Sequence, residues 1–461
     1  MPLTIPSLIY PVFESALLGG RELTIDTPPT AFTGIPCGAL QTDQHVNWLG
    51  DENLRGSNVK TYSLVQSNYW AEVTVPASPA YADTLPIPAF SMLGDYTTTG
   101  TAASPNSTLN GAVAAGATSI TVTSGTGFLA NQWVQVDIGT LAEVVKIQSV
   151  SSNTLTLTTG TPTRFSHLTG VAITNTTANY THTFSAINPN SSTGNTSAQP
   201  PTYTFLHRNL VAGSGNHNSD QYSYSRFTDL KLTGTKDGWF TWDGKFTSYL
   251  RNYPSTDYTP SFTSVPAFPT WQAALSLASG QVYNVSEFSI TINRELDIVT
   301  TADGSQNPYV IAAGPLTAMF GIDYDAVSDE TALGYVLNNT QPTLSIVFTN
   351  GLSSPNTESI TINAQLAGHK DAPLSAMKTL WGFKTTGELV ANTTNVGNSG
   401  GYGPLQMVFV NSVPSFLQVS AATSARAAAS RSVSSLVSAL SAASSAALRS
   451  TSTAPVIVNS M

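Results

Sequence analysis

The stretch Val285–Val299, VSEFSITINRELDIV, alternates apolar with polar side chains along its length. The apolar set is Phe288, Ile290, Ile292, Leu296 and Ile298, and the polar set is Glu287, Ser289, Thr291, Asn293, Glu295 and Asp297. Only Arg294 interrupts the apolar set. Because side chains alternate between the two faces of an extended chain, this pattern predicts a half-buried β-strand. Its apolar face requires a second sheet to cover it, and its polar, mildly acidic face has no group that suggests catalysis.

The same alternation recurs in residues 344–349, 360–366 and 405–409, and Gly, Pro and Asn residues separate these segments. Strands joined by such turns predict an all-β fold, an antiparallel β-sandwich or barrel. Composition agrees, because charged residues make up only 10% of the chain while Ser, Thr, Asn and Gly are abundant. A chain of 461 residues is long enough for two or three domains.

Charge and cysteine content disfavour several classes of function. The formal net charge is -9 and no Lys/Arg cluster stands out, which disfavours tight binding of nucleic acid. Cys37 is the single cysteine, so we expect neither an internal disulfide nor a cysteine-rich metal site. The N-terminal segment lacks the pattern of a signal peptide, and no apolar run approaches the roughly 18 residues of a membrane helix. We therefore expect a soluble protein or a component of an assembly.

The N-terminal quarter of the chain is rich in proline. Residues 1–50 are predicted to form an extended arm followed by turns. Residues 59–75 alternate in the manner of a strand pair, with Asn68 as the turn. Residues 82–93, ADTLPIPAFSML, are apolar with two prolines and predict a packed loop or a short interrupted helix.

A separate module is predicted at residues 109–174. Polar, low-complexity segments flank it on both sides, TTTGTAASPNST before it and NTTANYTHTFSAINPNSSTGNTSAQPP after it. Within it, short apolar alternations around Ile120, Trp133, Val145 and Leu155 are separated by glycines. This pattern predicts a small β-barrel-like module inserted into a larger domain.

The remaining chain is predicted to contain two tandem sandwich domains. Residues 226–249 form a hairpin pattern around Lys236-Asp-Gly, and its first half resembles Val285–Val299 as a faint internal repeat. A proline-rich segment at 254–269 separates the two copies. The predicted division is 1–50, arm and turns; 51–108 with 175–258, a discontinuous first domain; 109–174, the insert; 259–418, the second domain; and 419–461, an Ala/Ser-rich tail that is disordered or helical only when docked.

No motif predicts catalysis, a cofactor or a metal site. The histidines are His45, His167, His182, His207, His217 and His369, and none falls in a metal-ligand spacing. Cys37 with His45 lacks an orienting third group, and Asp323 with Asp325 lacks the spacing of a calcium loop. The glycine-rich segment 397–403 lacks the Lys-Ser/Thr of a phosphate-binding loop. We predict that the protein is not an enzyme.

Aromatic residues offer one alternative. Trp239, Trp242 and Trp271, with Phe240 and Phe246, are able to form a platform for a sugar ring. The structural interpretation is favoured, because Trp242 and Phe246 lie on predicted strands that need core side chains. No paired carboxylates accompany the aromatic residues, so glycoside hydrolysis is not supported.

Several segments together resemble one family. They are AFPTWQAALSLASGQVYNVSEFSITINR at 267–294, PLTAMFGIDYDA at 315–326, QPTLSIVFTNG at 341–351, ESITINAQLAGHK at 358–370 and LRGSNVKTYSLVQSNYWAEVTVPASP at 54–79. In order and pattern they resemble the tail tube proteins, or major tail proteins, of long-tailed bacteriophages. The segments GAVAAGATSITVTSGTGFLANQWVQVD and TRFSHLTGVAI are similar to a small β module that recurs as an insertion in phage structural proteins. The resemblance covers about residues 50–415.

This resemblance implies a structural virion protein of tail-tube fold. Its subunits would close into a pseudo-sixfold ring, a trimer of two-domain subunits or a hexamer, and the rings would stack into the conduit for genome DNA. The implied partners are further copies of the chain, the tape measure, the tail terminator and the distal tail protein, with assembly in the host cytoplasm and no membrane. Glu287, Thr291, Glu295 and Asp297 would face a lumen that repels phosphate. Equally, these carboxylates are expected on any solvated outer face.

Two rival functions remain. A secreted or surface adhesin that binds carbohydrate would suit the aromatic residues and the Thr/Asn-rich strands, although no signal peptide is predicted. A tail-associated depolymerase of β-rich fold would need a carboxylate pair that the sequence does not reveal.

Overall fold

The computed structural model describes residues 15–417 with short gaps. The gaps are 54, 56–58, 100–105, 138–140, 177–179, 187–198, 211–216, 254–257, 259–261, 263–264, 303, 326–330, 352–356, 378–379, 392–402, 412 and 414. Residues 1–416 form one compact unit, and 417–461 form a second. The tail predicted at 419–461 and nearly all of the glycine-rich segment lie outside the described residues. So do residues 177–179 and 187–198 of the predicted second tether. The tether prediction is wrong for residues 180–186, which form a strand paired on both sides.

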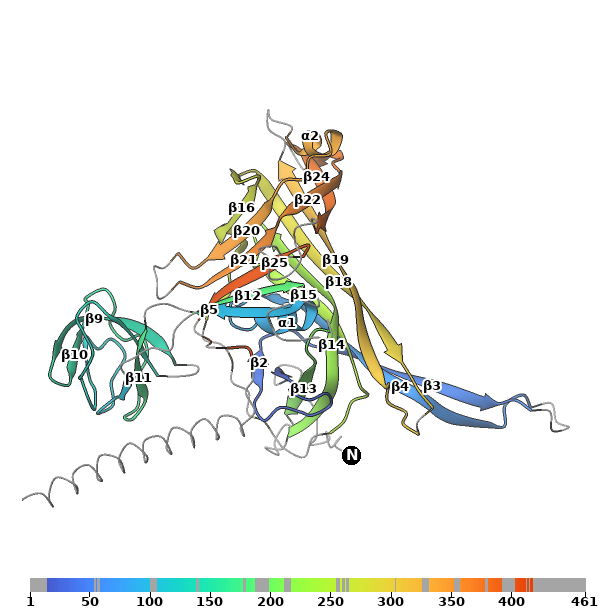
Figure 1. Cartoon of the computed structure of the whole chain (residues 1–461), viewed down its shortest axis with the longest axis horizontal. Helices are drawn as coiled ribbons and strands as arrows, with labels where there is room; N and C mark the ends of the chain where they lie inside the picture. The colour runs from blue at the N-terminus through green and yellow to red at the C-terminus, as the bar shows by residue number, and fades with distance from the viewer. Residues whose placement is uncertain are drawn as a thin grey trace, which may run out of the picture. The chain divides into compact units, whose positions relative to one another are not determined.

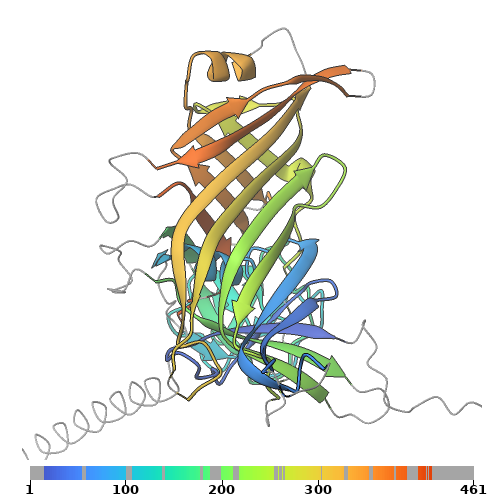
Figure 2. The ribbon, with the colours of Figure 1, turned by 90° about the vertical axis from the view of Figure 1, so that its right-hand side faces the viewer.

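The all-β fold class is confirmed, since the named strands pair antiparallel throughout. The largest sheet has 12 strands. Its main path is β2 (Thr33–Ile35), β1 (Ala16–Arg21), β13 (Tyr203–Leu210), β14 (His217–Thr235), β18 (Val285–Val299), β19 (Val310–Asp325), β24 (Leu380–Val390) and β22 (Leu366–Asp371). Off this path, β15 (Thr241–Ser248) joins β14 to β4 (Ser63–Pro79), β3 (Gln41–Asp51) pairs with β4, and β23 (Leu374–Met377) pairs with β24. The long central strands β14, β18 and β19 lie side by side (Figure 2).

A sheet of 7 strands packs against the apolar face of this long sheet. Its order is β17 (Gly280–Val282), β16 (Ala273–Leu277), β20 (Leu344–Thr349), β21 (Ser359–Ala364), β25 (Gln406–Asn411), β12 (Tyr180–Ala186) and β5 (Gly94–Thr99). Between the sheets, Phe240 stacks on Phe348 with ring centroids 4.1 Å apart, and Phe288 contacts the same ring from β18. Two sheets that bury their inner faces against each other form a sandwich.

Strand β18 confirms the predicted alternation in its first half. Phe288, Ile290 and Ile292 are buried, and the residues between them are partly exposed. Arg294 follows the buried set into the interior. A register shift against β19 lies immediately after it, where a Cβ on Gly314 would lie 3.1 Å from the carbonyl oxygen of Glu295. Beyond it the alternation continues with less burial, because Leu296 and Ile298 are partly exposed while Glu295 and Asp297 are exposed.

The N-terminal predictions need correction. Asn68 does not form a turn, because β4 runs through it and pairs with β3, which lies inside the predicted arm. The side chains of Asn47 and Asn68 meet at an irregularity of this ladder, with Nδ2 of Asn47 2.6 Å from Oδ1 of Asn68. The polar sequence of β3, QTDQHVNWLGD, lacks the apolar alternation of a half-buried strand, so its position in the sheet was not predictable from pattern.

Residues 82–93 contain the helix that was one of the two predicted alternatives. Helix α1 (Pro86–Leu93) has prolines in its first turn, where they cost no intrahelical hydrogen bond, and all its side chains are buried. It ends at Gly94, whose φ of 90° is left-handed and whose N–H donates to the carbonyl of Phe90. Two short elements complete the unit, α2 (Thr331–Leu337) and the 3-10 turn Thr270–Gln272.

The inserted segment forms a sheet of 6 strands with its own apolar cluster. The order is β6 (Asn106–Thr108), β11 (Ala172–Thr176), β8 (Trp133–Val136), β9 (Glu143–Ser151), β10 (Thr154–Leu157) and β7 (Ser119–Thr121). Its cluster includes Ile120, Val134, Val145 and Leu155, which are almost fully buried. A separate core is what an independently packed module requires.

The two predicted tandem domains share both sheets of the sandwich. Strand β14 pairs with β18 across the proposed boundary at 258/259, and β12 pairs with β25 across it. One apolar cluster includes side chains from both sides of that boundary. The division into two tandem domains, and the tube fold, stay predictions.

Gly125 gives a direct test of the insert's packing. A Cβ at Gly125 would lie 1.9 Å from the carbonyl oxygen of Ser152, and backbone cannot move aside as a side chain end does. We expect Gly125→Ala to destabilise the module by about 1–3 kcal/mol, measured as lost hydrogen-exchange protection in β9 and β10. Gly160→Ala is the matched control, because no atom lies within 4 Å of its Cβ position. Equal protection in both variants would contradict this packing.

Candidate assembly interface

The four residues predicted to face a lumen lie away from the core of the sandwich. Glu287, Glu295 and Asp297 are exposed and Thr291 is partly exposed. Thr291 pairs with Lys231 on β14 and with Met319 on β19, so its side chain belongs to the outer face of the long sheet. Whether this face lines a lumen stays a prediction.

Lysines on neighbouring strands offset much of the acidic charge of this face. Lys384 Nζ lies 3.0 Å from Asp323 Oδ2, and that hydrogen bond and charge raise the pKa of Lys384. In the ladder of β14 and β15, Asp229 faces Lys245 and Lys231 faces Asp243. Cross-strand pairs of opposite charge stabilise a sheet by about 0.2–1 kcal/mol each. The face thus carries mixed charge, although β18 read alone is acidic.

The β3–β4 hairpin projects beyond the rest of the long sheet (Figure 1). The outer part of β4 pairs with β3, and β15 pairs only from Ala71 onward. Within the described residues, β3 has no second neighbouring strand. The end of the hairpin carries large exposed apolar side chains, namely Trp48 (55% exposed), Leu49 (61%), Val59 (57%), Leu64 (63%) and Val65 (59%).

Both faces of the hairpin end are apolar. Leu49 pairs directly with Val65, so these two side chains share one face. Trp48 pairs with Gln66 and Gly50 with Leu64, which places Trp48 and Leu64 together on the opposite face. Contiguous exposed apolar side chains mark surfaces that are covered by another molecule. A hairpin that is apolar on both faces fits an insertion between neighbouring chains, not a one-sided contact.

His182 shows how a predicted non-catalytic histidine serves the fold. His182 is fully buried and connects β12 with the end of the compact unit. Its Nδ1 lies 2.9 Å from Tyr96 Oη, and its Nε2 lies 2.8 Å from the carbonyl of Val413 and 3.1 Å from Asn411 Oδ1. Tyr96 Oη accepts from the N–H of Phe416. Burial lowers the pKa of His182, so the neutral ring suits this network.

His182 gives a pH prediction of definite sign. A lowered pKa in the native state means that the unfolded state binds more protons below about pH 6.5, so stability falls as pH decreases through that window. We expect acidification from about pH 7.5 to about pH 5 to reduce the difference in unfolding temperature between the wild type and His182→Gln. Burial raises the pKa values of Glu22 and Glu358, so these groups increase stability as pH decreases. Their contribution is the same in both proteins and cancels in the difference. A pH-independent difference would contradict the prediction.

The aromatic residues divide between core and surface. Trp242, Phe240 and Phe246 are in the core, as the structural interpretation predicted. Trp239 is 54% exposed and Trp271 is 74% exposed. Trp239 forms a β-bridge with Pro269, which brings the two tryptophans to the same end of the sandwich.

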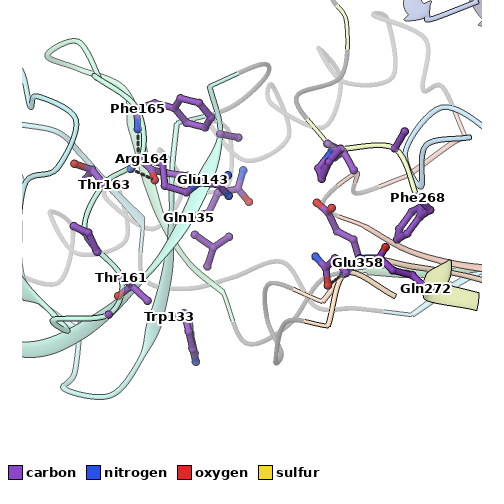
Figure 3. A pocket seen from close by; sticks show the side chains of 18 of the residues that line it. Trp133, Gln135, Glu143, Thr161, Thr163, Arg164, Phe165, Phe268, Gln272 and Glu358 are labelled. Atoms are coloured by element: carbon purple, nitrogen blue, oxygen red, sulfur yellow. Dashed lines mark hydrogen bonds between the residues drawn. The ribbon is translucent and has the colours of Figure 1, made fainter. Parts of the chain in front are cut away.

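Sequence reasoning missed a polar cluster in the insert. The buried ring of His167 lies with Nε2 2.6 Å from Glu143 Oε1 and Nδ1 3.3 Å from Asp137 Oδ2. Glu143 also accepts from the backbone N–H groups of Arg164, at 2.6 Å, and Phe165, at 3.3 Å (Figure 3). His167 follows Asp137 by 30 positions and Glu143 by 24, so no local spacing indicated the cluster. These hydrogen bonds attach the loop at residues 164–167, which precedes β11, to Glu143 of β9.

Cys37 and His45 do not form a nucleophile–base pair in the described structure. Burial raises the pKa of Cys37 to about 12, which keeps its thiol protonated. His45 lies against Trp70 and Glu72 and makes no recorded contact with Cys37. Within the described chain, no three His, Cys, Asp or Glu side chains gather as metal ligands. Neither described helix has the length and apolar character needed to cross a membrane.

No family model matches the chain, and no curated protein is significantly similar to it. The exposed hairpin and the mixed-charge face are therefore the features from which a function is inferred.

Proposed function

We propose that this chain is a structural subunit that assembles with copies of itself into stacked rings, forming the tail tube of a long-tailed bacteriophage through which genome DNA passes. The observation that carries the proposal is the β3–β4 hairpin, with exposed apolar side chains on both faces of its end. An apolar hairpin of this kind is unfavourable in water, and burial of each large side chain in a neighbouring copy contributes about 1.5–3 kcal/mol. The partner in this proposal is a second copy of the chain.

The long sheet also supports the proposal. Its outer face carries paired charges of both signs and no described cluster of basic side chains, so it would hold DNA weakly. Glu287, Thr291, Glu295 and Asp297 would be the lumen-facing set on β18. In such a tube the further partners would be the tape measure, the tail terminator and the distal tail protein. The protein would be located in the virion.

Electron microscopy of the purified chain tests this function, together with a molar-mass measurement before and after concentration. Rings or tubes with threefold or sixfold symmetry are the expected result, and a threefold average would support two tandem domains in each subunit. A monodisperse monomer at all concentrations, without tubes, would contradict self-assembly.

A carbohydrate-binding adhesin is the second candidate, and the exposure of Trp239 and Trp271 favours it. Exposed tryptophans at one end of a sandwich suit stacking on sugar rings. Glycan screening with wild type and Trp271→Ala distinguishes the two functions. Binding that depends on Trp271 in a chain that stays monomeric would support the adhesin.

A further inference from the structure

Two arginines lie in the interior, near the middle of neighbouring strands. Arg226 on β14 is 4% exposed and Arg294 on β18 is 5% exposed. The pairing of β14 with β18 ends at Asp229 and Asn293, so both arginines lie just beyond the paired segment. A buried guanidinium is strongly destabilising unless an anion or several acceptors compensate its charge.

The buried guanidinium of Arg226 has partners for some of its donors and for its charge. Its Nη1 donates to Gln199 Oε1 at 2.8 Å and to the carbonyl of Ile311. The buried carboxylate of Glu22 attracts it electrostatically. The same carboxylate already accepts from the N–H of Tyr224 and the hydroxyl of Thr204. The Nε of Arg226 is buried and has no acceptor.

Arg294 has fewer partners than Arg226 within the described chain. Its Nε is buried without a hydrogen-bond acceptor, and it takes part in none of the ion pairs of the described residues. Burial and, to a smaller extent, the charge of Arg226 lower the pKa of Arg294 to about 10. Arg294 therefore remains cationic at neutral pH. The charge of Arg226 acts on Arg294, whereas the carboxylate of Glu22 acts on Arg226.

We propose that Arg294, together with the Nε of Arg226, binds an oxyanion of the carboxylate or phosphate type. A guanidinium presents Nε–H and Nη–H as a planar fork that matches two oxygens of such a group. One anion would supply acceptors for the unpaired donors and cancel the excess positive charge. Two sources have this chemistry, a free anion from solution or a carboxylate of a neighbouring copy in the assembly proposed above.

Inorganic phosphate is the probe for the free anion. The unfolding temperature of the full, unassembled chain is measured against phosphate concentration at constant ionic strength, with sodium chloride as the balance. We expect a saturable rise of about 3 °C or more in the wild type and none in Arg294→Met. Arg251→Met is the control, because Arg251 is a partly exposed arginine beside Asp220 and its loss should leave the response unchanged. An equal rise in Arg294→Met would mean an adventitious ion only and would overturn the proposal.

Two further measurements keep the proposal testable. In chloride alone, Arg294→Met should unfold at the same or a higher temperature than the wild type, because it removes an uncompensated charge; a clear decrease would overturn the proposal. If Arg294→Met does not fold, Arg294→Lys keeps the charge but loses the fork, and an undiminished phosphate response in this variant would have the same meaning.

Assembled particles distinguish the two sources. If a neighbour's carboxylate occupies the site, phosphate stabilises the unassembled chain but not the particles. If the anion comes from solution, both respond. No response in the unassembled chain overturns the proposal in either case. Failure of the chain to assemble would contradict the proposed function and leave the phosphate measurement valid.

Discussion

Replacement of both Trp48 and Leu64 by serine is expected to abolish assembly while the chain remains folded. These side chains share one face of the hairpin end and are more than half exposed, so they contribute little to the stability of the single chain. In an interface, the loss of two large apolar contacts costs about 3 kcal/mol or more, which weakens association roughly 100-fold at each contact. Light scattering and electron microscopy measure the loss, and the circular dichroism spectrum should be unchanged.

The matched control replaces Leu129 and Leu168 by serine. Both are exposed apolar side chains, 63% and 76%, but they lie on the insert. This variant should assemble as the wild type does. If it loses assembly to the same extent, general surface hydrophobicity and not the hairpin drives association. The variant Leu49→Ser with Val65→Ser then tests the second face, and full assembly in that variant would contradict an insertion covered on both sides.

Trp242→Ala is expected to lower the free energy of unfolding by about 3–5 kcal/mol. Trp242 on β15 is 1% exposed and packs in the cluster that joins both sheets, so its removal leaves a large cavity. Trp239→Ala, three positions earlier, removes the same side chain from a site that is 54% exposed and should change stability by less than about 1 kcal/mol. Urea unfolding followed by tryptophan fluorescence measures both. Similar effects of the two substitutions would contradict the assignment of Trp242 to the core.

Alternation of apolar and polar residues was a sufficient signal where several large apolar side chains follow one another on the buried face. It was not sufficient for β12 (Tyr180–Ala186), whose buried residues are His182 and Phe184. It predicted β18, β20, β21 and β25 and the all-β class, because in these strands every second residue meets the opposite sheet. It failed for β3, where few side chains meet a core and the strand is held by backbone pairing with β4. Asn68 was mistaken for a turn because asparagine is common in turns. In β4 it lies where the pairing with β3 is irregular.

The candidate interface was harder to predict than the fold. Exposure of Trp48 and Leu64 depends on which strands lack a neighbour, and that is a property of the sheet order, not of local sequence. The lysines opposite the acidic residues of the long sheet come from β14, β15 and β24, so β18 alone suggested a more acidic face than the sheet has. Arg294 was visible in sequence only as an interruption, and its burial became evident with the register shift at Gly314.

Strand β25 occupies an inner position of its sheet, between β21 and β12, although it follows every other described strand in sequence. Until residue 411 has left the ribosome, β12 and β21 each keep an open edge, and Asn411 cannot donate to the carbonyl of Ala82, 329 positions earlier. The sandwich is therefore completed only after residues 406–411 have been translated. Nascent chains on one messenger therefore cannot assemble before β25 is in place. Until then their open strand edges make protection by chaperones important.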